Sequence, residues 1–407
     1  MHTKKETNSI QGISFDSLAK SFGTPLYIYD AGKIASQINV LRTAFENINI
    51  KYAAKALTNV SILHFMKQQG VGVDVVSIQE AQIAFRAGFA PGDIMFTPNC
   101  VGFEEIVQGV DMGVTINLDN LPVLEKFGAK YRDSYPCVLR LNPDILAGGN
   151  YKISTGHSHS KFGISIHSAN EIKNIIQRYG VRIQGLHIHT GSELTDVDVF
   201  MKMADILFGL ASDFAHLQFL DFGGGLKVGY RPGDSVTDVA ALGKRLSKAF
   251  RDFKEKQGRD LKLWMEPGKF LVSDAGLLLV KTNVVKETPK VTFVGVDSGL
   301  NHLIRPMMYD AYHTILNVSN PDGPIRTYTV VGNVCETDTF GSDRELNEVR
   351  EGDLLVIQNA GAYGYSMASN YNSRLRPAEV MILNGEAKLI RHRDTLEQIL
   401  AGQIDIF

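Results

Sequence analysis

Lys55 follows the apolar residues Tyr52, Ala53 and Ala54 at the end of a run that is typical of a β-strand, residues 48–54. Loss of hydration at such a position favours the neutral amine of a lysine over its ammonium form. A neutral amine can condense with an aldehyde, so Lys55 is a candidate for covalent catalysis. The alternative is a lysine whose side chain only carries its charge out to solvent.

Three consecutive glycines, residues 223–225, follow another strand-like run, 219–222. Their backbone N–H groups can approach a bound anion such as phosphate closely, although a tight turn without a ligand explains the glycines equally well. Glu266 ends the next run, 263–266. Its carboxylate could hold a proton on a ring nitrogen, bind a metal or form a salt bridge.

Two His-x-His pairs, His157 with His159 and His187 with His189, raise the question of a metal site. Strand alternation places His187 and His189 on the same face. The sequence has no HExxH pattern, however, and a histidine ring can equally stack on an aromatic ring.

Cys335 and Glu336 are neighbours in the segment 333–340 and could form an acid–base or nucleophilic pair. This segment contains no histidine, which argues against a protease-like dyad. A single cysteine is more often a buried structural thiol.

Eight short runs rich in β-branched residues indicate how these side chains are positioned, because most runs are separated by segments with helical spacing. Eight is the number of parallel strands that closes a (β/α)8 TIM barrel, and an open doubly wound sheet is the alternative. The runs are 48–54, 72–76, 94–97, 115–118, 137–141, 183–187, 219–222 and 263–266.

Helix starts are predicted at Asn59 and Ser77. Apolar residues follow Asn59 at helical spacing, and Gly70 is expected to end that helix. Ser77 and Glu80 have the spacing of a capping box.

Polar residues gather just after the carboxyl ends of these runs, which meet at one mouth in a barrel. Loops are often polar, but that does not explain why Lys55, His189 and Glu266 adjoin apolar runs. A lysine follows the first run, a histidine the sixth, the glycines the seventh and a glutamate the eighth. Together these groups would suit an aldehyde cofactor that carries a phosphate. The polar residues are Lys55, Asp74, Asn99, Asn142, His187, His189, Asp221 and Glu266.

A different pattern begins after Gly276, where strand-like stretches alternate with turn residues. They predict an antiparallel β-domain that the run 25–29 joins. We therefore expect a barrel over residues 30–275 and a β-sandwich or barrel-like domain from residues 1–29 together with 276–407. The stretches are 277–285, 291–296, 328–331, 353–357 and 380–383.

Composition excludes several classes of protein. The 42 basic and 44 acidic residues give a net charge of −2, which provides no basic surface for nucleic acid. No apolar run approaches the roughly 18 residues that span a membrane, and the N-terminal residues lack a signal peptide's apolar core. The three cysteines are expected to be free thiols in a reducing cytoplasm, so we predict a cytoplasmic protein.

The chain resembles the diaminopimelate decarboxylases, which belong to the alanine-racemase-like (fold type III) pyridoxal-phosphate enzymes. The segments RPMMYDAYH and SMASNYNSRLRPAE resemble these enzymes more than ornithine or arginine decarboxylases. The resemblance implies the cofactor pyridoxal 5'-phosphate and the decarboxylation of meso-2,6-diaminopimelate to L-lysine and CO2, the last step of lysine biosynthesis. Further matching segments are GTPLYIYD, KYAAKA, VDVVS, TGHSHSKFG, HIHTGSEL, LDFGGGL, EPGKFLV, DSGLNHLI, VCETDTF and GAYGY.

The resemblance also implies a role for each matching residue. Lys55 would bind the cofactor covalently, His189 would stack on its ring, and Glu266 would pair with the ring nitrogen. Cys335 would donate a proton, and because Cys335 and Glu336 of the partner subunit would reach the site, a homodimer is implied. The phosphate would be held by Ser192, Gly224, Gly225, Gly268, Lys269 and Tyr363, and the substrate by Lys269, Arg305, Tyr309, Glu336 and Tyr363.

Two residues depart from the family pattern. Lys269 stands where an arginine is usual, and a lysine lacks the two-pronged grip of a guanidinium on a carboxylate. Glu193 replaces a glutamine or similar residue, and its charge would oppose a nearby phosphate if it pointed inward.

Three other functions stay open at this stage. Within the same fold, the substrate could be ornithine, arginine or a carboxylated polyamine, or the reaction could be racemisation. A metal-dependent barrel hydrolase would use the histidine pairs and Glu266. A pyridoxal-phosphate carrier without catalysis is disfavoured by the pair of Cys335 and Glu336.

Overall fold

The computed structural model describes residues 8–145 and 155–407. Within these residues, the chain divides into two compact units. The barrel unit comprises Ser36–Gly229 and Ser235–Leu271, and the sheet unit comprises the segments up to Ala35, Tyr230–Asp234 and Val272–Phe407. None of the helices in the described ranges combines the length and apolar character that crossing a membrane requires.

Eight parallel strands of the barrel unit close into a ring. β4 to β8 pair in sequence, β8 pairs with β10, and β12 returns to pair with β4. This closure confirms the predicted (β/α)8 barrel over the open sheet, and each predicted run matches a strand to within one residue at either end. The strands are β4 (Ile48–Ala53), β5 (Gly72–Val75), β6 (Ile94–Phe96), β7 (Thr115–Leu118), β8 (Cys137–Asn142), β10 (Ile183–Ile188), β11 (Phe219–Asp221) and β12 (Lys262–Met265), with the short β9 (Ile164–Ser165) beside β8.

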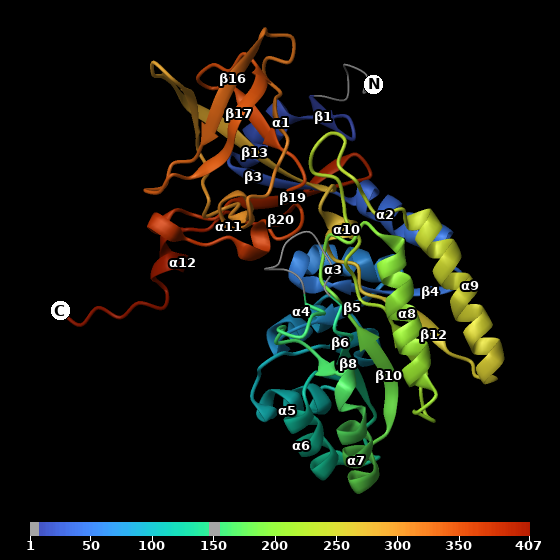
Figure 1. Ribbon diagram of the computed structural model, residues 1–407. Helices are drawn as coiled ribbons and strands as arrows, with labels where there is room; N and C mark the ends of the chain where they lie inside the picture. The colour runs from blue at the N-terminus through green and yellow to red at the C-terminus, as the bar shows by residue number, and fades with distance from the viewer. Residues whose placement is uncertain (1–7, 146–154) are drawn as a thin grey trace. The chain divides into compact units, whose positions relative to one another are not determined.

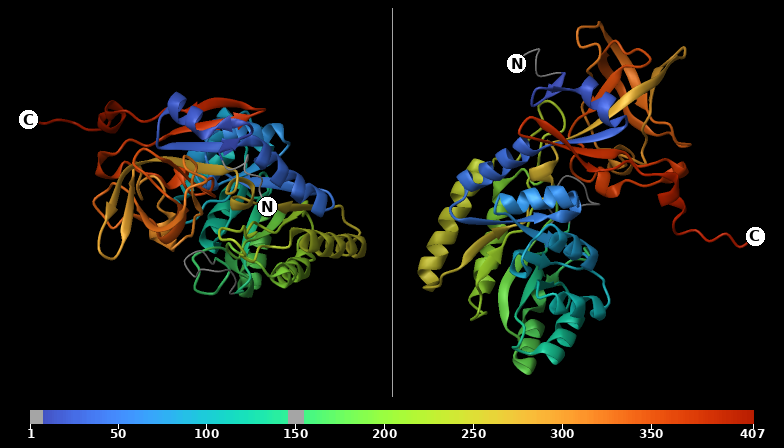
Figure 2. Two further views of the ribbon diagram at one scale, coloured as in Figure 1. Left: turned by 90° about the horizontal axis from the view of Figure 1, so that it is seen from above. Right: turned by 180° about the vertical axis from the view of Figure 1, so that it is seen from behind.

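Helices lie on the outside of the strand ring (Figure 1). Figure 2 shows from behind that α3 to α6 lie along one side of the ring and α8 and α9 along the other. The helices are α2 (Ala31–Ala44), α3 (Val60–Gln68), α4 (Ile78–Arg86), α5 (Phe103–Asp111), α6 (Leu121–Tyr131), α7 (Ala169–Tyr179), α8 (Val197–Ala211), α9 (Val239–Gln257) and α10 (Lys269–Val272).

Two predicted helix starts are found in the structure. Asn59 caps α3, which ends two residues before Gly70. Ser77 caps α4 by accepting a hydrogen bond from the N–H of Glu80. The Glu80 carboxylate accepts from the N–H of Val76 instead of that of Ser77, so only half of the predicted capping box forms.

The sheet unit is built on a sheet with the order β17-β16-β14-β13-β3-β19-β20, and β18 pairs with both β13 and β15. β3 comes from the N-terminal part of the chain, as predicted. Most pairings are antiparallel, but β14 with β16 and β19 with β3 are parallel, which the sequence did not predict. The strands are β3 (Leu26–Asp30), β13 (Gly276–Glu287), β14 (Thr292–Val296), β15 (Ile315–Asn317), β16 (Ile325–Val331), β17 (Thr339–Asn347), β18 (Leu354–Ile357), β19 (Ala378–Leu383) and β20 (Glu386–Arg391).

β3 is central in this sheet and buried on both faces. Leu26 and Ile28 pack into a hydrophobic core, and Tyr29 donates its hydroxyl hydrogen to Glu379 at 2.7 Å. Around the sheet, the described residues also form a small hairpin and several short helices. These are β1 (Ser9–Ile10), β2 (Ile13–Ser14), α1 (Phe15–Phe22), α11 (Arg305–Tyr309) and α12 (Leu396–Leu400).

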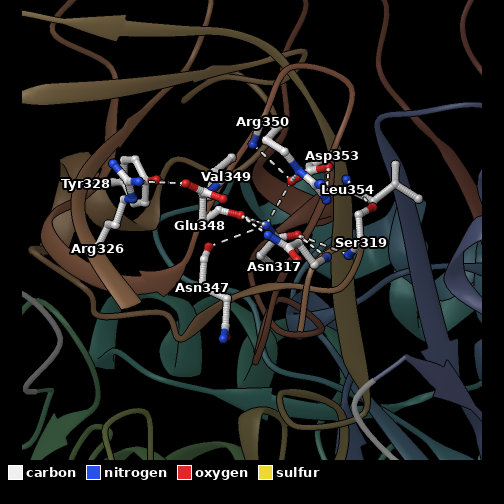
Figure 3. A network of polar contacts seen from close by, with 11 residues as sticks. Asn317, Ser319, Arg326, Tyr328, Asn347, Glu348, Val349, Arg350, Asp353 and Leu354 are labelled. Atoms are coloured by element: carbon white, nitrogen blue, oxygen red, sulfur yellow. Dashed lines mark hydrogen bonds and ion pairs between the residues drawn. The ribbon is translucent and has the colours of Figure 1, made fainter. Parts of the chain in front are cut away.

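Asn317, at the end of β15, fastens the loop between β17 and β18 (Figure 3). Its amide donates to the carbonyl oxygen of Glu348 at 2.8 Å and to the carboxylate of Asp353 at 3.0 Å. Asp353 also accepts from the N–H of Arg350. Because Asn317 is only 2% exposed, these bonds take the place of hydration and hold the loop in one conformation.

Candidate active site

The segments that follow the barrel strands form one rim, since the strands are parallel. Backbone hydrogen bonds join them: the N–H of Glu266 donates to the carbonyl of Gly223 at 2.7 Å, and the N–H of Ala53 donates to that of Pro267 at 3.3 Å. The structure therefore brings most predicted barrel residues to one place. These are Lys55, His189, Ser192, Gly224, Gly225, Glu266, Gly268 and Lys269.

The two lysines of KYAAKA, Lys51 and Lys55, lie towards opposite ends of the barrel strands. Lys51 Nζ lies 2.9 Å from the carbonyl oxygen of Asp93, which precedes β6, and burial lowers the pKa of Lys51. Lys55 follows β4 in a short 3-10 turn at the rim and is half-buried. The charge of Lys55 helps to lower the pKa of Glu266, which places the two residues in one electrostatic environment.

Glu266 is a buried carboxylate, 6% exposed, at the first position after β12. Its Oε2 lies 3.1 Å from Nε2 of His187. Burial alone would raise the pKa of Glu266, but the contact with His187 and the charges of Lys55 and Arg140 outweigh it and lower that pKa. Glu266 is therefore ionised at neutral pH, and its Oε1 accepts no hydrogen bond from the part of the chain that the structure describes.

A chain of buried polar groups orients His187. The amide nitrogen of Asn117 lies 2.9 Å from Nδ1 of His187 and also donates to Thr97 at 3.3 Å. The hydroxyl of Thr97 donates to Asp74 at 2.7 Å. Burial lowers the pKa of His187, so its ring is neutral. With Nδ1 accepting from Asn117, the ring hydrogen sits on Nε2 and faces Glu266. Sequence reasoning missed Asn117 and Thr97 as part of this site.

The glycine segment after β11 fits closely against the rim. A Cβ atom on Gly224 would lie 2.5 Å from the carbonyl oxygen of Glu266, so this position excludes any side chain. Gly223 has a φ of 62°, a conformation that glycine adopts without strain. The N–H of Gly224 donates to Nδ1 of His189 at 3.2 Å. Burial, followed by the charge of Lys55, lowers the pKa of His189 well below its usual value, and its ring is neutral.

The two residues that depart from the family pattern are paired with each other. Lys269 Nζ lies 3.1 Å from Oε1 of Glu193, and their side chains are 10% and 25% exposed. A hydrogen bond from the N–H of Leu194 to the carbonyl of Gly225 holds this segment against the glycines. The Glu193 carboxylate therefore faces an ammonium group, which offsets the charge that the sequence suggested would be unfavourable.

Arg305 lies in the sheet unit at the start of α11 and is 4% exposed. Its guanidinium lies 4.7 Å from the ring centre of Tyr230, and Nη1 lies 3.3 Å from Nε2 of His313. Burial lowers the pKa of His313 to about 3, so this ring is neutral and accepts from Arg305. Among the described residues, no carboxylate forms an ion pair with Arg305. An arginine in this state suits an anionic ligand.

The other predicted residues of the sheet unit lie in irregular segments or at a helix end. Tyr309 ends α11 and is half-buried. Tyr363 has a φ of 57°, which is uncommon for a residue with a side chain and is frequent at functional sites. Cys335 and Glu336 are exposed neighbours that both contact Tyr371, a residue that the sequence did not single out.

The two histidine pairs do not form a common metal site among the described residues. His157 and His159 contact each other, with Nδ1 of His157 accepting from the N–H of His159. The group with donor atoms close enough for a metal ion contains His187 together with Asp221 and Glu266.

Comparison with known proteins gives a consistent result. Residues 31–273 match the family model of the pyridoxal-dependent decarboxylases, pyridoxal binding domain. The diaminopimelate decarboxylase of Methanothermobacter thermautotrophicus is 37% identical over 97% of this chain and 95% of its own length. The enzyme of Neisseria meningitidis serogroup B is also 37% identical, over 96% of each chain. The chain belongs to the diaminopimelate decarboxylase family.

Solved structures of this family have the same fold. The diaminopimelate decarboxylase of Methanocaldococcus jannaschii in complex with L-lysine is 33% identical to this chain and has a TM-score of 0.90. The match covers 98% of this chain and 97% of the other. A lysine/ornithine decarboxylase from Vibrio vulnificus, at 22% identity and a TM-score of 0.81, shares the fold. These findings confirm the family and fold predicted from the sequence, and they favour a pyridoxal-dependent carboxy-lyase over a metal-dependent hydrolase.

The rim of this diaminopimelate decarboxylase family member fits pyridoxal phosphate, the cofactor of the family. Glu266 offers a buried, ionised oxygen that can accept the hydrogen of a protonated pyridine nitrogen. His189 offers a neutral ring, and Gly224 lets the glycine segment lie directly against the backbone of Glu266, where a side chain would not fit. Lys55 supplies an amine at the same rim. The ring nitrogen, the ring face and the aldehyde of the cofactor therefore each have a chemically matched group at this rim.

Proposed function

We propose that this protein removes CO2 from meso-2,6-diaminopimelate and releases L-lysine, with pyridoxal phosphate at the rim of the barrel. The observation that carries this proposal is the 37% identity over 97% of the chain with a diaminopimelate decarboxylase. The rim alone would serve a decarboxylase for another amino acid as well. The relatives from M. jannaschii and Helicobacter pylori were solved with L-lysine, the product that we propose here.

The barrel residues bind and polarise the cofactor. Bound pyridoxal phosphate supplies an electron sink for the electron pair that remains when the bond to the leaving carboxylate breaks. Lys55 binds the cofactor through its amine. Glu266 holds a proton on the ring nitrogen, and His187 keeps that carboxylate in place from 3.1 Å. His189 packs its neutral ring against the pyridine, and Ser192 with the glycines binds the phosphate.

The sheet unit recognises the substrate. Arg305 binds a carboxylate, because it is a buried cation without an ion-pair partner among the described residues. Lys269 is already paired with Glu193, so Arg305 provides the stronger interaction with the substrate. Tyr309, Tyr363 and Glu336 complete the binding of the distal amine and carboxylate.

Cys335 donates the proton that replaces CO2 on the reacting carbon. We propose that Cys335 and Glu336 of the partner subunit complete each site, so that the active form is a homodimer. Mixing tests this: the variants Lys55→Ala and Cys335→Ser are each inactive, and their exchange into heterodimers restores up to about a quarter of the wild-type activity. No recovery after demonstrated subunit exchange would contradict shared sites. The cytoplasmic location stays a prediction from the three free cysteines.

The proposed function is tested by reaction and by trapping. Purified protein with pyridoxal phosphate should convert meso-diaminopimelate to equal amounts of lysine and CO2, and should leave ornithine, arginine and lysine unchanged. Reduction with borohydride followed by peptide mapping should place the cofactor on Lys55. Lys51, four residues earlier in the sequence, is the internal control. A label on Lys51, or turnover of ornithine or arginine instead of diaminopimelate, would overturn the proposal.

A further inference from the structure

The sulfur of Cys335 is held by the side chain of Asn372. The amide nitrogen of Asn372 donates to Sγ at 3.1 Å, and the amide oxygen accepts from the backbone N–H of Cys335 at 2.9 Å. The second bond fixes which way the amide faces, so a donor always points at the sulfur. Sequence reasoning gave Asn372 no role.

Tyr371 connects the same sulfur to Glu336. Its hydroxyl lies 3.4 Å from Sγ of Cys335 and donates to Oε1 of Glu336 at 2.9 Å. A hydroxyl has one hydrogen, so it can donate to only one of these atoms at a time. While Cys335 is a thiol, its S–H can donate to the tyrosine oxygen. Once the sulfur is a thiolate, the tyrosine hydrogen can turn towards it.

The backbone around Asn372 is held in an uncommon conformation. Asn372 and Ser373 have φ values of 55° and 53°, and two consecutive left-handed residues are rare outside glycine. Asparagine tolerates this region better than most residues. The loop thus brings an amide to Cys335 at a backbone position that few other side chains could occupy.

We propose that Asn372 and Tyr371 are positioning residues that fix the sulfur of Cys335 and stabilise the thiolate that remains after it has given its proton away. This inference rests on the proposed function for the role of Cys335 as proton donor. In that step the S–H bond breaks, its electron pair stays on sulfur, and a C–H bond forms on the reacting carbon. Solvent then returns a proton to the sulfur.

The direction in which the pKa of Cys335 is shifted agrees with this arrangement. The hydrogen bond from Tyr371, followed by that from Asn372, lowers the pKa of the Cys335 thiol, while the charge of Glu336 acts in the opposite direction.

Alkylation of the thiol tests the proposal directly. We use the cofactor-loaded protein in a Cys100→Ser background, since Cys100 is the other exposed cysteine and Cys137 is buried. The rate of reaction with iodoacetamide across pH gives the pKa of Cys335. Asn372→Gly suits the left-handed backbone and removes the amide. It should raise that pKa by about one unit and slow alkylation at pH 7 about tenfold.

Two further variants sharpen the test. Asn372→Asp keeps the shape but replaces the donor by a negative charge, so it should raise the pKa of Cys335 further than Asn372→Gly does. Tyr371→Phe should raise it as well. Ser373→Gly alters the same loop without removing a donor to the sulfur and should leave the pKa unchanged. A pKa that is the same in Asn372→Gly, Asn372→Asp and the unsubstituted background would overturn the proposal.

Kinetics separates this inference from the proposed function. With meso-diaminopimelate, Asn372→Gly should lower kcat several-fold at neutral pH with little change in KM, and the basic limb of kcat should move to higher pH. An unmoved limb together with a raised thiol pKa would overturn the link to proton donation. If the wild-type protein does not turn over diaminopimelate, the proposed function fails. The alkylation result still tests whether Asn372 and Tyr371 stabilise the thiolate of Cys335.

Discussion

The ion pair at the rim joins Glu193 and Lys269, the two residues for which the sequence predicted a departure from the family pattern. We predict that it contributes to the stability of the barrel. Exchanging Glu193 for Gln and Lys269 for Met, separately and together, gives a double-mutant cycle that isolates their interaction.

The structure sets the size of the effect. At the N–O distance of 3.1 Å, an effective dielectric constant of about 20 gives an attraction of about 5 kcal/mol. Most of this is offset because the ammonium and the carboxylate lose hydration. Hydrogen bonds to charged groups contribute roughly 1.5–3 kcal/mol net. Because the Glu193 side chain keeps 25% of its exposure, we expect a coupling free energy near the lower end, about 1.5 kcal/mol.

Trp264 provides the assay. It is the only tryptophan in the sequence, it belongs to β12, and it stacks on Phe219 at a centroid distance of 3.6 Å. Its fluorescence during urea denaturation of the cofactor-free protein therefore reports the barrel and gives the free energy of unfolding for each variant.

Additive effects would refute the reasoning. If the double variant loses the sum of the two single losses to within about 0.3 kcal/mol, the two charges do not interact in the folded protein. The salt dependence is a second check. Because the pair is largely buried, most of the coupling should persist at 1 M salt, at which an exposed pair is screened over roughly 3 Å.

Three further predictions concern the glycine segment after β11, the sheet unit and the pH dependence of stability. Gly224→Ala should weaken binding of pyridoxal phosphate by about tenfold or more in an absorbance titration, since its Cβ would lie 2.5 Å from the carbonyl oxygen of Glu266; unchanged affinity would contradict the close fit. Asn317→Ala should lower the free energy of unfolding of the sheet unit by about 2–3 kcal/mol, because buried groups lose their partner; calorimetry would detect the lower melting temperature. Burial, then the charge of Glu266, raises the pKa of Asp221 well above its usual value, so its stabilising contribution is full below about pH 4 and is lost as the pH rises through its folded pKa. In the Trp264 assay of the cofactor-free protein, the free energy of unfolding of Asp221→Asn should therefore increase relative to that of the wild type as the pH is raised from 5 to 8. If the difference between the two proteins is the same at both pH values, the prediction is wrong.

The barrel strands were predictable because parallel strands buried on both faces appear as continuous apolar runs. β17 was not predictable, because its sequence TFGSDRELN contains no such run and it becomes a strand by pairing with β16. The sequence does contain a signal for the hairpin that ends with β20. Asn384 and Gly385 have φ values of 53° and 77° and form the two-residue turn of a hairpin, for which Asn-Gly is a strong indicator.

In the site, Lys55 and Glu266 could be predicted because each directly follows an apolar strand. The pair of Glu193 and Lys269 could not, because 76 residues separate them and only the closed ring brings them together. The same holds for Asn372, which lies 37 residues from the cysteine that it contacts. Contacts of this kind depend on the tertiary fold and leave no periodic pattern in the sequence.

The position of β3 has a consequence for the order in which the protein is made. The ribosome synthesises β3 before any strand of the barrel, yet its two neighbours, β13 and β19, emerge only after the last barrel strand is complete. Until then both edges of this apolar strand lack their hydrogen-bonding partners. Slowing translation after residue 275 should therefore increase the amount of chaperone bound to the nascent chain, because β3 then stays unpaired for longer.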